Sequence, residues 1–221
     1  SYALGARVIE GELTAASARL IVSGGRAIIR VNQDETYAHR KRFSIAHELG
    51  HFILRHGHSA ERVCTDYNFN DWYGGTEEAQ ANAFAAELLL PKALVSSYCD
   101  VKNVDFEGAK IISEAFKVSL TPSARRFVEL NPEICALVYC QEGRIKWFSS
   151  SEDWHYFINV GGQPDTQSPV SAFFSSGKII DEPVELRGNV WLGGRSPDYL
   201  VEHTVVSKNI SFSLTILWEE P

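Results

Sequence analysis

The sequence lacks most of the features that mark secreted, membrane-spanning or nucleic-acid-coating proteins. Its 221 residues include no methionine and only four cysteines, too few for a disulfide scaffold. It has no apolar run of about eighteen residues to cross a membrane, and its N-terminus lacks the basic-then-apolar pattern of a signal peptide. The net charge of −7 does not suit a protein that coats nucleic acid. We therefore expect a reduced, cytoplasmic protein with no membrane segment.

The hydrophobic pattern predicts an α+β protein. Hydrophobic residues make up 44% of the chain and charged residues 22%, an ordinary globular balance. Residues 18–32 read as a β-hairpin around Gly24 and Gly25, because two β-branched runs flank a turn signal. Residues 43–56 have helical spacing of apolar side chains. Residues 76–90 predict a second helix, with Thr76 as N-cap and Pro91 just beyond its end.

The second half of the chain changes in character. Two short helices are predicted between residues 105 and 130, an outline shared by DNA-reading helix–turn–helix motifs and by plain three-helix packing modules. After residue 131 the runs ICALVYC and RIKWFSS flank Gln141-Glu142-Gly143 and predict a second hairpin. Two more strand-like runs follow, VELRGNVWL and NISFSLTILW. The last ninety residues are therefore expected to be β-rich and separate from the helical half.

The stretch FSIAHELGHFILRH, residues 43–56, carries a candidate metal site. His47 and His51 are four residues apart, so on a helix they share a face and can offer two imidazole nitrogens to one Zn²⁺. Glu48 lies about 100° around the helix, where its carboxylate can reach a water molecule on the metal. This HExxH pattern is typical of metallopeptidases, although an ordinary buried helix can carry it by chance.

A catalytic zinc needs a third protein ligand, and the helix predicted over residues 76–90 offers Glu77 and Glu78. Asn82 lies four residues after Glu78 on the same face and can hydrogen-bond a ligand histidine, which favours Glu78. The alternative is that both glutamates only complement the helix dipole.

With these residues in view, the sequence resembles the ImmA/IrrE family of metallopeptidases. The resemblance lies in FSIAHELGHFIL followed by EEAQANAFAAELLLP, where Glu78, Asn82, Phe84 and Pro91 match the pattern of the family's second helix. It is strong over residues 20–95 and weaker beyond. It implies a thermolysin-like minimal metallopeptidase domain at 1–103, a helix–turn–helix-like helical linker at 104–131, and a β-rich GAF-like sensor domain at 132–221.

The resemblance also implies a function. Zn²⁺ would be held by His47, His51 and Glu78, with Glu48 as general base. The substrate would be a helix–turn–helix repressor of the Xre type, cut to switch on a DNA-damage, mobile-element or phage-defence response. The ligand of the sensor domain stays open between a small molecule, single-stranded DNA and another protein. The alternative is a non-catalytic regulator that binds a repressor with the same fold.

Other residues near the motif are candidates with plain alternatives. Cys64 can act as an inhibitory cysteine switch if its thiolate takes the fourth zinc position, or it can be a small buried hydrophobic residue. Strand 26–32 can bind an extended substrate by strand addition if it lies at a sheet edge, or it can belong to a core hairpin. The candidate oxyanion stabilisers are four loop residues: His56, His58, Tyr67 and Tyr73.

Overall fold

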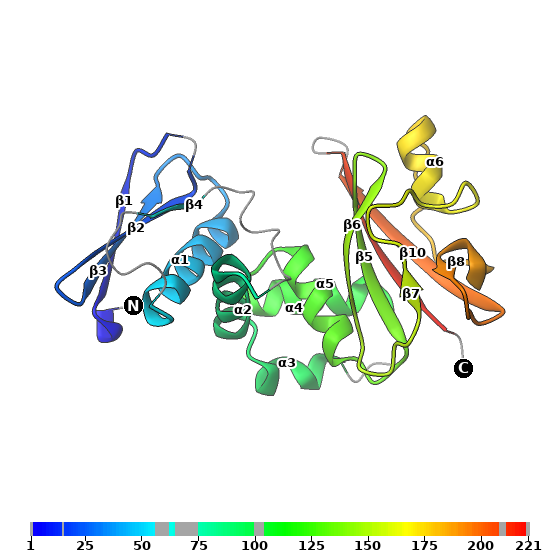
Figure 1. The fold of residues 1–221 in the computed structure, drawn as a ribbon, viewed down its shortest axis with the longest axis horizontal. Helices are drawn as coiled ribbons and strands as arrows, with labels where there is room; N and C mark the ends of the chain where they lie inside the picture. Colours follow the sequence, from blue (N-terminus) through cyan, green and yellow to red (C-terminus); the bar gives the residue numbers. More distant parts are fainter. Residues whose placement is uncertain are drawn as a thin grey trace. The chain divides into compact units, whose positions relative to one another are not determined.

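The computed structural model describes residues 2–14, 16–55, 62–64, 75–99, 104–207 and 211–219, with only the backbone described for residues 62–64. The chain divides into two compact units (Figure 1). One comprises Ser1–Pro91 with Phe116–Ser119, and the other Lys92–Ala115 with Leu120–Pro221. The three-part division at residues 103 and 131 stays a prediction.

The first unit contains a four-stranded sheet in the order β1-β3-β2-β4. Its strands are β1 (Ala6–Gly11), β2 (Ala18–Ser23), β3 (Arg26–Asn32) and β4 (Arg62–Cys64). The predicted hairpin is confirmed: β2 pairs antiparallel with β3, and Gly24 and Gly25 between them have φ angles of 56° and 73°. These left-handed values explain the two glycines in the turn. Of the two alternatives for residues 26–32, the free edge for strand addition is wrong, because β3 pairs with β2 on one side and in parallel with β1 on the other.

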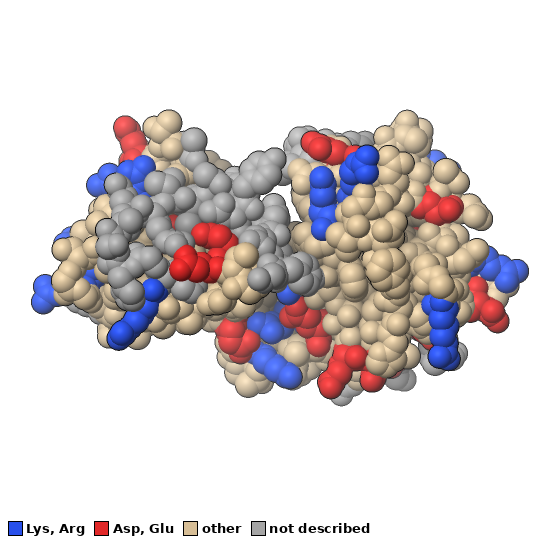
Figure 2. Space-filling model, in the orientation of Figure 1, with Lys and Arg blue, Asp and Glu red and all other residues tan. Residues whose placement is uncertain are grey.

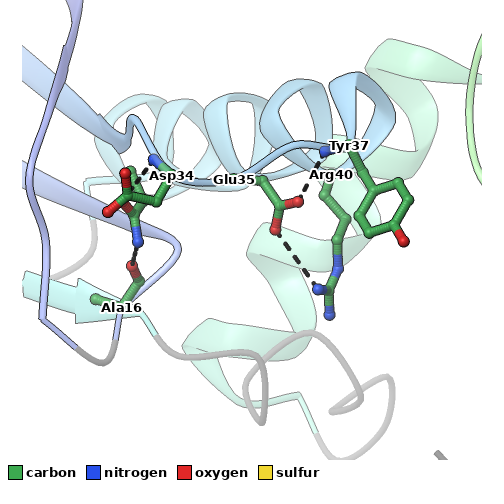
Figure 3. A network of polar contacts seen from close by, with 6 residues as sticks. Ala16, Asp34, Glu35, Tyr37 and Arg40 are labelled. Carbon is green, nitrogen blue, oxygen red and sulfur yellow. Dashed lines mark hydrogen bonds and ion pairs between the residues drawn. The ribbon is translucent and has the colours of Figure 1, made fainter. Parts of the chain in front are cut away.

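Helix α1 (Ala38–Ile53) lies against one face of this sheet (Figure 1). Leu49 of α1 packs in a core cluster with Leu20 and Ile29 from the strands. The helix begins five residues before the predicted start at residue 43. The segment before it is held by Glu35, whose Oε1 accepts a hydrogen bond from the Tyr37 backbone N–H at 2.9 Å and whose Oε2 lies 3.5 Å from Arg40 Nη1 (Figure 3).

Helix α2 (Glu77–Leu89) follows the predicted boundaries closely. Thr76 is its N-cap, as predicted, and its side-chain oxygen accepts a hydrogen bond from the Ala79 backbone N–H at 3.0 Å. This contact satisfies one of the N–H groups that a helix leaves without a partner in its first turn. The cap therefore fixes where α2 starts, one residue before Glu78.

The second unit begins with a helical region. Its helices are α3 (Lys92–Cys99), α4 (Phe106–Phe116, its last residue grouped with the first unit) and α5 (Leu120–Leu130). The pair predicted between residues 105 and 130 is confirmed. Arg125 and Arg126 of α5 lie 2.6 and 3.6 Å from Glu129, with side chains only 17% and 13% exposed. These two arginines are engaged within the unit, which disfavours a DNA-reading role for α5.

A five-stranded antiparallel sheet forms the rest of this unit, in the order β6-β5-β11-β10-β8. Its strands are β5 (Cys135–Gln141), β6 (Arg144–Ser150), β8 (Val184–Arg187), β10 (Tyr199–Ser207) and β11 (Phe212–Trp218). The smaller elements around it are β7 (Phe157–Ile158), α6 (Pro169–Ser176) and β9 (Leu192–Gly193). The β-rich character of the last ninety residues is confirmed. The run VELRGNVWL is not one strand: it is broken at Gly188, where a Cβ would overlap the Pro197 carbonyl oxygen.

A buried carboxylate, Glu202 on β10, organises one face of this sheet. It is 1% exposed and accepts hydrogen bonds from Trp191 Nε1 at 2.6 Å, Ser168 Oγ at 2.9 Å and Thr204 Oγ1 at 2.9 Å. Burial raises the pKa of Glu202, and these donors offset the rise only in part. Because Ser168 is also the N-cap of α6, the contact ties that helix to the sheet.

Candidate metal centre

The candidate site lies between two helices of the first unit. Helix α1 supplies His47, Glu48 and His51, each 0% exposed, and α2 supplies Glu78 and Asn82. Polar side chains this deeply buried are costly unless they are paired with one another or bind a metal. Their number on one helical turn therefore indicates a functional site rather than ordinary packing.

Gly50 sets how closely the two helices approach. A Cβ at this position would lie 3.1 Å from both the Cα and the carbonyl oxygen of Ala81 on α2, and 3.2 Å from Phe84 Cβ. Ordinary carbon contacts are about 3.5–4.0 Å. Only glycine fits here without moving α2 away, so Gly50 keeps the α1 histidines within reach of the α2 carboxylate.

Three possible metal-ligating atoms converge in this space. His47 Nε2 lies 3.0 Å from His51 Nε2, and Glu78 Oε2 lies 3.2 Å from the first nitrogen and 3.4 Å from the second. Among the described residues, this is the group of His, Cys, Asp or Glu side chains that could hold a metal ion. Zinc bonds of about 2.0–2.2 Å in a tetrahedron place neighbouring ligand atoms about 3.4 Å apart. The observed triangle therefore fits one face of a tetrahedral zinc site.

Asn82 orients one of the two imidazoles. Its Oδ1 lies 2.9 Å from His47 Nδ1. An amide oxygen only accepts hydrogen bonds, so Nδ1 carries the proton and Nε2 presents its lone pair toward the candidate site. Phe43, one turn earlier on α1, stacks on the same imidazole, with ring centroids 6.4 Å apart and planes 27° apart. The ring of His47 is thus fixed from two sides.

Electrostatics make Glu78 a strong ligand candidate. Partial burial raises the pKa of this carboxyl, but hydrogen bonds with His47 and His51 outweigh burial and hold the pKa well below its usual value. Glu78 is therefore ionised at neutral pH, as a metal ligand must be. Of the two glutamates at the start of α2, the structure brings Glu78 to the histidines, whereas Glu77 is exposed.

Several predicted site residues fall outside what the structure describes. The backbone of Cys64 lies in β4, which pairs with β2, but its side chain is not described. His56, His58, Tyr67 and Tyr73 also lie outside the described residues. The cysteine switch and the four oxyanion candidates therefore stay predictions.

The sequence alone does not reveal the roles of two residues that shape the site, Phe43 and Gly50. In the sequence, Phe43 and Gly50 only contribute to the apolar spacing of the first helix, whereas in the structure Phe43 stacks on His47 and Gly50 sets the helix spacing. A usable signal for the second was present. Small residues at Gly50 on one helix and Ala81 on the other are typical of helices whose backbones approach closely.

Fold and site together define an α+β domain whose candidate metal centre combines an HExxH helix with a glutamate from a second helix. A family match makes this specific: the family described as the IrrE N-terminal-like domain (Peptidase_M78) matches residues 3–127. The chain therefore belongs to the IrrE N-terminal-like domain family, and the suspected ImmA/IrrE relationship is confirmed.

One solved structure supports the same fold. A Mycobacterium tuberculosis transcriptional regulator is similar to this chain with a TM-score of 0.52 and 15% sequence identity, covering 96% of this chain. The chain spans 65% of that protein's length, and the likeness at this identity shows the fold alone. No curated protein matches the chain. Among the described residues, none of the helices is long and apolar enough to cross a membrane.

Proposed function

We propose that this chain is a zinc-dependent endopeptidase. The observation that carries the proposal is the triangle of His47 Nε2, His51 Nε2 and Glu78 Oε2, with sides of 3.0, 3.2 and 3.4 Å. Two imidazoles and one carboxylate are a ligand set used by zinc peptidases, and they leave one coordination position for water or substrate. The family's designation as a peptidase agrees with this reading.

The chain's own residues have separate tasks in this mechanism. A zinc ion in the site would supply Lewis acidity toward a peptide carbonyl and lower the pKa of a bound water to about 7. Glu48 acts as general base: its carboxylate accepts the proton of the attacking water and delivers it to the leaving amine. Asn82 holds His47 in the tautomer that frees Nε2. The burial of both histidines and of Glu48 limits access of bulk water.

The proposed substrate is a helix–turn–helix repressor of the Xre type. Its cleavage would switch on a DNA-damage, mobile-element or phage-defence response. Family membership motivates this assignment, and the structural similarity to a protein titled a transcriptional regulator agrees with a regulatory setting. In this proposal the enzyme works in the cytoplasm, where such repressors act.

The remaining segments are proposed to regulate the peptidase. Residues 1–103 form a thermolysin-like catalytic domain, 104–131 a helical linker and 132–221 a GAF-like sensor domain. A pocket of about 300 Å³ in the second unit is lined in part by Glu185, Asp198 and Glu219. These carboxylates would repel phosphate, so a small molecule suits this pocket better than single-stranded DNA.

The test compares purified zinc-loaded protein with its Glu48→Gln variant, each mixed with the repressor encoded beside this chain's gene. We expect zinc-dependent cleavage by the parent protein and a loss of at least about a hundredfold in the variant, the usual size of a general-base effect. Equal zinc content in the two proteins shows that the loss concerns chemistry rather than metal binding.

Binding without cleavage would favour the alternative, a non-catalytic regulator that holds the repressor with the same fold. Cleavage that survives Glu48→Gln would contradict the proposed general base. If Cys64 is the inhibitory switch, Cys64→Ser should be more active than the parent protein before any stimulus. Equal resting activities would exclude the switch.

A further inference from the structure

The face of the first unit's sheet that points away from α1 has an unusual composition. Strand register places its side chains in two cross-strand rows: one contains Arg7, Ile28 and Ile21, and the next Ile9, Arg30 and Arg19. Arg26 adds a fourth arginine at the start of β3. These seven positions form the arginine–isoleucine face. None of them is acidic and none is lysine.

This face is accessible at its centre. Ile28 belongs to β3, an inner strand with a neighbour on either side, yet its side chain is 41% exposed. The alternate residues Ala27 and Ile29 point toward α1 and are 2% and 0% exposed. Arg7 and Arg26 are exposed as well. One face of the same strands is thus a core, and the other is open.

The charge on this face opposes that of the whole chain. The chain carries −7, whereas the arginine–isoleucine face gathers four positive charges over three strands. Arg19 and Arg30 are direct cross-strand neighbours, so two of these four arginines lie side by side. On the side of the molecule drawn in Figure 2, basic and acidic side chains occur instead in small interspersed groups. A face whose charged residues are all basic, on an acidic chain, is complementary to an anionic partner.

The isoleucines favour an acidic protein over a nucleic acid as the partner. A nucleic-acid backbone offers phosphates for the arginines but no apolar surface against Ile9, Ile21 and Ile28, and the face has no aromatic side chain on which bases could stack. Arginine and apolar residues without lysine, aspartate or glutamate are instead the composition of a protein–protein interface. An amphipathic helix with apolar residues on one side and carboxylates at its flanks matches both components.

We propose that the arginine–isoleucine face is a docking surface for an acidic amphipathic helix of a partner protein. Strands of six or seven residues are about 20–23 Å long, the length of a helix of about fifteen residues. The isoleucines pack against the apolar side of that helix, and the exposed Arg7 and Arg26 pair with the carboxylates beside it. The surface lies on the side of the sheet opposite α1 and does not depend on proteolysis.

The test uses a synthetic peptide of about fifteen residues, with leucines at helical spacing and glutamates on both flanks, titrated into the full chain by calorimetry. A second peptide carries glutamine in place of every glutamate. We expect saturable binding of the acidic peptide, weakened about tenfold or more by Arg7→Glu combined with Ile28→Asp. Binding should also weaken as salt rises. The glutamine peptide should bind clearly more weakly.

The matched control is Lys178→Glu, which makes the same charge change as Arg7→Glu at an exposed position of the second unit and should leave binding unchanged. If circular dichroism shows that the double variant is misfolded, Arg7→Glu alone is used for the binding test, because a substitution at the exposed Arg7 leaves the core intact. Three results would overturn the proposal: no peptide binding, equal loss with Lys178→Glu, or tighter binding of a DNA duplex by the same arginines. Dimerisation that is abolished by Ile28→Asp, without peptide binding, would assign the face to a second copy instead.

Discussion

The close approach of α1 and α2 at Gly50 allows the metal-site geometry to be tested without touching a ligand. Gly50→Ala adds one methyl group 3.1 Å from Ala81 Cα and 3.2 Å from Phe84 Cβ. Restoring ordinary contacts of about 3.5–4.0 Å requires the helices to separate by roughly 0.5 Å. Because the histidines lie on α1 and Glu78 on α2, their separations of 3.2 and 3.4 Å would grow to about 3.7–3.9 Å, longer than a tetrahedral zinc face of about 3.4 Å.

Two energies oppose each other in this variant. Overpacking costs about 1–3 kcal/mol, whereas replacing glycine within a helix contributes about 1 kcal/mol. We therefore expect a net destabilisation of about 0–2 kcal/mol, measured by denaturant unfolding of the metal-free protein. Zinc affinity, measured by competition with a chromophoric chelator, should fall by about tenfold or more.

The control for Gly50→Ala is Gly108→Ala in α4. Its added Cβ would lie 2.5 Å from a ring carbon of Phe127, so this variant should also lose stability. It should keep full zinc affinity, because it does not lie between the site's helices. If Gly50→Ala binds zinc as tightly as the parent protein, the spacing argument is refuted, whatever its stability.

Three further predictions concern the Asn82–His47 contact, the buried carboxyl of Glu202 and the buried thiols of Cys135 and Cys140. Asn82→Ala should weaken zinc binding about 10–100-fold in a chelator competition, whereas Gln80→Ala on the exposed side of α2 should not. Burial raises the pKa of Glu202 above its usual 4.5. The protonated form therefore favours the folded state: its contribution to stability is fully present below about pH 4.5 and is lost as the pH rises through the folded pKa. Glu202→Gln should remove that part of the pH dependence in denaturant unfolding, and an unchanged slope would contradict it. Burial raises the pKa of Cys135 and Cys140 to about 12, so alkylation followed by mass spectrometry should label both only after unfolding.

The site was largely predictable from sequence because helical spacing is a local property. The i, i+4 relation of His47 and His51, and that of Glu78 and Asn82, required only that both segments be helical. The choice of Glu78 over Glu77 also followed from that spacing. The 3.0–3.4 Å distances between atoms of two helices depend on packing at Gly50, which no single segment contains.

The fold was predictable where a local signal was strong and was missed where distant segments decide. Both hairpins carried glycine turns, and α2 carried its own cap. The start of α1 was misplaced because its first turn, which includes His39, Arg40 and Lys41, is polar and Tyr37 before it offers no side-chain cap. The parallel pairing of β1 with β3, which rules out a free edge there, joins strands separated along the chain by β2 and has no local pattern.

The central claim is that Glu78 completes a zinc site with the two histidines of α1. It is tested most directly by zinc titration of Glu78→Gln beside Glu77→Gln, two identical changes at neighbouring positions. The account predicts stoichiometric binding with parent-like affinity for Glu77→Gln and a loss of about a hundredfold or more for Glu78→Gln, because only Glu78 lies within 3.4 Å of both imidazoles. Equal affinities for the two variants would contradict it.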